Sequence, residues 1–150
     1  MLKTLKRLFD EPSGNAAIPG FERRHLHLAV ATLLHESTRV DLEIHAAEHA
    51  AAERALAELF DIDRAACSVL LKEAGGKTGY LTSYYTQVAV IKRDCSMEQR
   101  VALIEHLWRI AYAHQPLDPY EDHFVRKIAH LLHVPNTQSM LARSRAHTEN

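Results

Sequence analysis

The stretch DLEIHAAE at residues 41–48 decides the fold, because it is repeated later in the chain as HQPLDPYE at residues 114–121. Each stretch follows an apolar, helix-like run and opens a second one. In the second copy Asp118 is a good N-cap, a proline follows at the first helical position, and Glu121 stands where a capping-box glutamate is expected. We therefore predict two helix–loop–helix units in which Glu48 and Glu121 lie near the N-termini of equivalent helices.

Alignment of the two copies extends the repeat upstream of the glutamates. It pairs the aliphatic residues Ile44 and Leu117, which we expect to be buried in equivalent places, and it pairs Asp41 with His114 in the turn. Two units are too few for a solenoid, so the repeat predicts a pseudo-twofold within one domain.

The composition is that of an ordinary soluble domain. The chain has 150 residues, is 47% hydrophobic and 25% charged, and carries a net charge of −1. Scattered basic residues give no footprint for nucleic acid, and no apolar run approaches the ~18 residues of a membrane span. Cys67 and Cys95 are the two cysteines and form no CxxC pair, which favours free thiols and a cytoplasmic protein. Eleven histidines are unusual, so metal binding has to be considered.

The spacing of apolar residues predicts an all-α bundle of about seven to eight helices and no strand. We assign residues 1–20 to a short basic amphipathic helix plus a linker, residues 21–146 to the helical domain and residues 147–150 to a polar tail. The expected helices cover approximately residues 1–9, 21–38, 46–60, 61–74, 80–92, 97–113, 119–133 and 137–146.

Particular residues fix the expected helix ends and faces. Ser96 and Gln99 form a capping box at the start of the longest helix, in which Ile104, Leu107 and Trp108 point inward and the neighbouring Glu105 and His106 are solvated. Other expectations follow from the same reasoning. They are an N-cap at Asp61, inward positions at Ala47, Val69 and Tyr85, and a helix end at Gly75-Gly76.

The basic helix expected at residues 1–9 has leucines on one side and lysines on the other. We expect it to pack on its own domain or on a second subunit, which leaves a homodimer open. Contact with an anionic membrane surface is the lesser alternative.

Several stretches of this sequence resemble those of a known protein family. The strings LWRIAYA at 107–113 and LDPYE at 117–121, together with the acidic turn at 41–48, resemble the tellurite-resistance TerB family, from about Leu26 to Arg143. The likeness is closest to small stand-alone TerB-like proteins of bacteria and extends to the TerB-like domain of a DnaJ-type co-chaperone. It implies an all-helical protein linked to stress resistance, with acidic loops that bind divalent metal and no established enzymatic activity.

The chain departs from the family pattern at two points. Leu42 stands where the family usually has glycine, and His114-Gln115 replaces a second Asp-Gly. Loss of an aspartate removes a hard oxygen ligand, and the imidazole that replaces it makes Zn²⁺ more plausible than Ca²⁺ or Mg²⁺.

The candidate metal ligands are Asp41, Glu48, His114 and Glu121, with Glu36 as an addition from the preceding helix. The preferred alternative is that these side chains only cap helices and bond to loop amides, since caps need the same residue types. The string HAAEH at residues 45–49 matches the H-x-x-E-H motif of inverted zinc peptidases. The repeat places His45 at a cap, outside the helix, which argues against that motif.

These observations predict a non-enzymatic, stress-linked module that senses metal or binds an unidentified protein partner. A pure helical scaffold without metal remains the main alternative. A small metal-dependent hydrolase is the other, and it would also need an open coordination position at the acidic loops.

Overall fold

The computed structural model describes residues 20–38, 46–78, 84–113 and 117–149, and all regular structure in these ranges is helical. The helices are α2 (Gly20–Ser37), α3 (Ala46–Phe60), α4 (Arg64–Thr78), α5 (Tyr85–Asp94), α6 (Met97–Ala113), α7 (Pro119–Leu131) and α8 (Asn136–Glu149). The predicted all-α fold is confirmed. The helix predicted at residues 1–9 lies outside the described residues.

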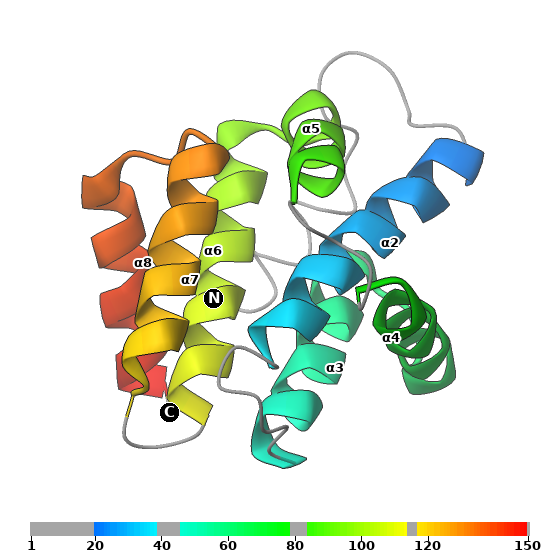
Figure 1. Cartoon of the computed structure of the whole chain (residues 1–150), viewed down its shortest axis with the longest axis horizontal. Coiled ribbons are helices and arrows are strands. Elements are labelled where there is room, and N and C mark those ends of the chain that lie inside the picture. The colour runs from blue at the N-terminus through cyan, green and yellow to red at the C-terminus, as the bar shows by residue number, and fades with distance from the viewer. Residues whose placement is uncertain (1–19, 39–45, 79–83, 114–116, 150) are drawn as a thin grey trace.

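Two helices form the centre of the bundle. α6 packs against α3, α7 and α8, and α2 packs against α3, α4 and α5 (Figure 1). The helices α6, α7 and α8 lie side by side, and each reverses the direction of the one before it. The first turns of α3 and α7 point toward the same end of the molecule in this view.

The core is built on the apolar positions of these two central helices. Leu33 and Leu34 of α2 are fully buried, as are Ile104, Leu107 and Trp108 of α6. The inward face predicted for the longest helix is therefore correct. Burial of side chains this large supplies the main free energy of folding.

Helix starts follow the predicted cap chemistry at two places. The Ser96 N–H donates to the Gln99 side chain over 2.7 Å and the Gln99 N–H donates to Ser96 Oγ over 3.3 Å, which is a reciprocal capping box. At α7, Asp118 accepts the Tyr120 N–H over 2.7 Å, and the proline occupies the first turn. These caps fix where α6 and α7 begin.

The predicted N-cap of α4 is wrong. Asp63, not Asp61, caps the helix, since its carboxylate accepts the Ala66 N–H over 2.8 Å. Asp61 instead adopts a left-handed φ of 53° directly after the last residue of α3, a conformation that aspartate tolerates better than most residues.

The predicted end of α4 is also wrong. The helix runs through Gly75 and Gly76 to Thr78. A Cβ on Gly75 would lie 3.1 Å from Cε1 of His35, so this glycine lets α4 approach α2 closely instead of ending the helix.

Three residues that were predicted to point inward are exposed instead. Val69 is 60% exposed and Tyr85 is 78% exposed, whereas Cys67, Leu70 and Leu71 carry the buried face of α4. Ala47 is exposed near the start of α3. Helix α8 continues to Glu149, three residues past its predicted end at Ala146. Within the described residues, no helix is long and apolar enough to cross a membrane.

Candidate functional site

The two glutamates of the repeat are buried carboxylates at helix starts. Glu48 is the third residue of α3 and is 0% exposed, and Glu121 is the third residue of α7 and is 1% exposed. Their predicted position near two helix N-termini is confirmed, and the positive end of the helix dipole favours a carboxylate there. Burial of a carboxylate is costly unless nearby polar or positive groups compensate for the lost solvation.

The other predicted ligands are only partly described. Asp41, His114 and the aliphatic Ile44 lie outside the described residues, so the pseudo-twofold of the two units stays a prediction. Leu117 is partly buried and packs on the core. Glu36 is turned toward the start of α5, where its carboxylate accepts a hydrogen bond of 3.1 Å from the Tyr84 hydroxyl.

The described residues alone do not assemble a metal centre. No group of three or more histidine, cysteine, aspartate or glutamate side chains that could hold a metal occurs in the described ranges. A site at the helix starts would therefore need donors from the segments that precede α3 and α7.

A second buried polar cluster contains Glu105 and His106, so the prediction that these two side chains are solvated is wrong. Glu105 is 1% exposed and accepts hydrogen bonds from Arg109, over 2.9 Å, and from Arg145. His106 is 2% exposed, and its Nε2 lies 3.7 Å from a carboxylate oxygen of Glu58. A guanidinium nitrogen of Arg109 also lies 3.6 Å from Glu58, so charged contacts join α3, α6 and α8.

The charge state of this cluster follows from burial. Desolvation, with a smaller effect from the Arg109 guanidinium, lowers the pKa of His106 to about 3. The imidazole is therefore neutral near pH 7, and its approach to Glu58 is not an ion pair. Arg109 and Arg145 place two positive charges beside the Glu105 carboxylate, which offsets the cost of burying it.

The signal for this cluster was present in the helix itself. All residues of α6 from Ala102 to Trp108 are buried, because α6 is surrounded by α3, α7 and α8. A helix that is apolar on most of its circumference has little solvated face, so its polar residues are buried with partners.

The cysteines and the H-x-x-E-H string offer no catalytic group. Cys67 and Cys95 are free and buried, and burial raises the pKa of both thiols, that of Cys95 to about 12. Protonated thiols are poor nucleophiles. On α3, Glu48 is buried whereas the His49 side chain is 46% exposed and lies 3.2 Å from Glu53, so Glu48 and His49 do not face one site.

Fold and site together define a class of protein, namely a small all-helical domain with buried carboxylates in the first turns of two helices. Comparison with known families is more specific. The family model described as tellurite resistance protein TerB matches residues 27–144, and the chain belongs to that family. No match was found among curated proteins or among solved structures.

Proposed function

We propose that this protein is a non-enzymatic, tellurite-resistance-like module that senses a divalent metal ion at the loops preceding α3 and α7. The observation that carries the proposal is the burial of Glu48 and Glu121 at the same helical position in two separate helices. Carboxylate oxygens in the first turn of a helix, next to the loop that precedes it, are suited to bind a cation.

The proposed ligands are Asp41, Glu48, His114 and Glu121, with Glu36 as a further candidate. The histidine decides which metal we expect, because imidazole nitrogen binds Zn²⁺ better than Ca²⁺ or Mg²⁺. Bound metal would link donors from the two loops to the first turns of α3 and α7, which offers a way to signal metal to a protein partner without any chemical reaction.

Titration with Zn²⁺ at pH 7.5 tests the proposal. We expect saturable binding to the wild type, and a loss of at least about tenfold in affinity for His114→Ala, Glu48→Gln and Glu121→Gln. Glu98→Gln is the matched control, since Glu98 lies in the first turn of α6 but is exposed. Its affinity should equal that of the wild type.

The pH dependence of Zn²⁺ binding tests the histidine ligand, and a comparison with Ca²⁺ tests the choice of metal. Since imidazole binds metal in its neutral form, Zn²⁺ affinity should fall as the pH drops below about 6.5. Equal Zn²⁺ binding by wild type and His114→Ala, or none by either, contradicts the proposal and leaves these residues as helix caps. Stronger binding of Ca²⁺ than of Zn²⁺ would reject the choice of metal.

A further inference from the structure

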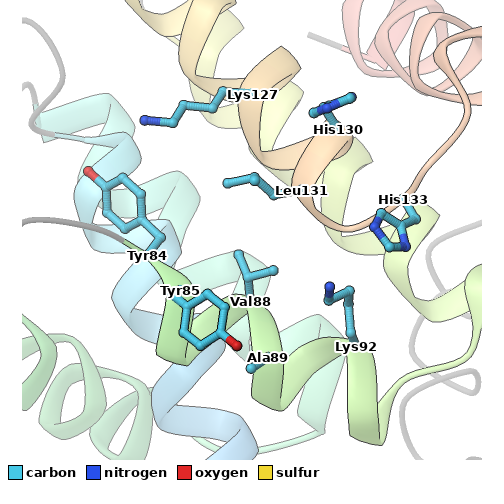
Figure 2. Close-up of a pocket in the computed structure, with 9 residues that line it drawn as sticks. All are labelled: Tyr84, Tyr85, Val88, Ala89, Lys92, Lys127, His130, Leu131 and His133. Atoms are coloured by element: carbon cyan, nitrogen blue, oxygen red, sulfur yellow. The ribbon is translucent and has the colours of Figure 1, made fainter.

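A groove of about 500 Å³ lies between α5 and α7. Its lining residues are Tyr84, Tyr85, Val88, Ala89, Lys92, Lys127, His130, Leu131 and His133 (Figure 2). The volume falls in the range of about 300–1,000 Å³ that is typical of pockets for small molecules.

The floor of the groove is apolar and one wall is aromatic. Figure 2 shows Val88 and Leu131 facing each other across the middle. Tyr84 is held in place by its hydrogen bond to Glu36 and by an edge-on contact with Phe124, with ring centroids 5.5 Å apart. Tyr85 is 78% exposed, which is a large fraction for an aromatic side chain. A ligand would therefore meet one fixed and one adaptable ring.

The charged groups that line the groove are all basic. Lys127 lies at one end, with its Nζ 5.8 Å from the centre of the Tyr84 ring, and Lys92 lies at the other end beside His133. Among the described lining residues none carries a carboxylate. Cations at both ends of an apolar floor complement a molecule that has an apolar body and a negative charge.

One side chain joins the two walls at their C-terminal ends. The guanidinium of Arg100 donates to the carbonyl oxygens of Lys92 over 3.0 Å, Cys95 over 3.2 Å and Leu132 over 3.2 Å. It thereby ties the C-terminal end of α5 to that of α7. The groove is thus formed before any ligand arrives, which reduces the entropy that binding would cost.

We propose that this groove binds a small organic anion, an aromatic or aliphatic molecule that carries a carboxylate, sulfonate or phosphate group. The tyrosines and the aliphatic floor contact the apolar body, and Lys92 or Lys127 pairs with the anionic group. None of the proposed metal ligands lines the groove, although Glu36 contacts its wall through the hydrogen bond to Tyr84. The groove variants below alter no proposed metal ligand, so each proposal has its own test.

The probe for the test is 8-anilinonaphthalene-1-sulfonate, an aromatic sulfonate whose fluorescence rises in apolar surroundings. We expect saturable binding with one site per chain and a Kd below 1 mM. Amide resonances of Val88 and Leu131 should shift with the same Kd in NMR spectra of the wild type, which locates the site without any substitution. The neutral analogue N-phenyl-1-naphthylamine should bind at least about tenfold more weakly.

Paired variants test the two parts of the groove. Lys92→Gln combined with Lys127→Gln should weaken sulfonate binding about tenfold, whereas Lys72→Gln on α4 should leave it unchanged. Ala89 is exposed in the groove, so Ala89→Glu should also weaken binding about tenfold, and Ala65→Glu on α4 is its matched control. Circular dichroism melts check that each variant is folded.

Three results overturn the proposal. The first is the absence of saturable binding below 1 mM, and the second is equal affinity for the sulfonate and its neutral analogue. The third is that every amide resonance that shifts belongs to a residue outside α5 and α7. The variants give one more contradicting result. Equal sulfonate affinity of the double lysine variant and Lys72→Gln would show that neither Lys92 nor Lys127 binds the anionic group.

Discussion

At the scale of single residues, burial rather than residue type determines the chemistry of the histidines. His106 is enclosed on α6, and His27 is partly enclosed, with its ring tilted by 34° to that of Phe60 at a centroid distance of 4.0 Å. Desolvation is the main cause that lowers the pKa of both imidazoles, to about 3 for His106 and about 4 for His27. Both are therefore neutral in the folded protein at pH 7, where a solvated histidine would already be partly protonated.

The pKa of His106 predicts how stability depends on pH. In the unfolded chain a histidine takes up a proton near pH 6.5, but in the folded protein His106 does so only near pH 3. Between these values the unfolded state binds more protons, so the free energy of unfolding falls as the pH falls. From pH 7.5 to pH 5.0 this residue should remove about 2 kcal/mol.

Urea unfolding at both pH values measures the effect in the wild type and in His106→Gln. The variant should lose about 2 kcal/mol less than the wild type over this range. His123→Gln replaces an exposed histidine of α7 and serves as the control. Equal pH dependence in the wild type and His106→Gln would show that the imidazole is already protonated in the folded protein at pH 5.0.

At the scale of elements, α6 holds the bundle together. Its capping box fixes where it begins, and its buried residues contact the helices on either side. Leu107 and Ile104 are 0% exposed at the centre of this helix. Each substitution Leu107→Ala and Ile104→Ala should lower the free energy of unfolding by about 2–5 kcal/mol, the usual cost of a cavity left by a buried aliphatic side chain.

Denaturant melts test this expectation against a matched leucine. Leu141 on α8 is 55% exposed, so Leu141→Ala should change the free energy of unfolding by no more than about 0.5 kcal/mol. Losses of that small size at Leu107 or Ile104 would mean that the core does not depend on this face of α6.

The adjacent glycines of α4 give a second prediction at this scale. A Cβ on Gly76 would meet no atom within 4 Å, so Gly76→Ala should stabilise the protein by about 0.5–1 kcal/mol through better helix propensity. A Cβ on Gly75 would lie 3.1 Å from the His35 ring, which must yield to make room. Gly75→Ala should therefore be less stable than Gly76→Ala. Thermal melts that rank the two variants in the opposite order would contradict the role of Gly75 in helix approach.

At the scale of the whole molecule, local sequence patterns predicted where helices begin better than they predicted which side chains contact other helices. Ser96, Asp118 and the proline after it act within one helical turn, so the sequence reveals where α6 and α7 begin. The positions of Val69 and Gly75 depend on how α4 lies against α2, which no local pattern encodes. The same limit applies to Glu105, whose two arginine partners come from its own helix and from α8.

The candidate sites divide in the same way. Spacing alone predicted that Glu48 and Glu121 lie in equivalent first turns, because the cap chemistry that places them is local. The groove could not be predicted from sequence, since Lys92 and Lys127 belong to different helices and line one groove only because α5 and α7 lie on either side of it. Family membership covers residues 27–144 and therefore includes both regions.

The three carbonyl contacts of Arg100 have a mechanical consequence for α5 and α7. Both helices are fastened at the same end by a single side chain, so they cannot separate there without breaking charge-assisted hydrogen bonds. At the opposite end the contacts are between the Tyr84 ring and both Phe124 and Lys127 of α7, and such ring contacts are weaker than charge-assisted hydrogen bonds. A bulky molecule would therefore separate the two helices more easily beside Tyr84 than beside Arg100, and a change at Arg100 would release the end that is otherwise held fixed.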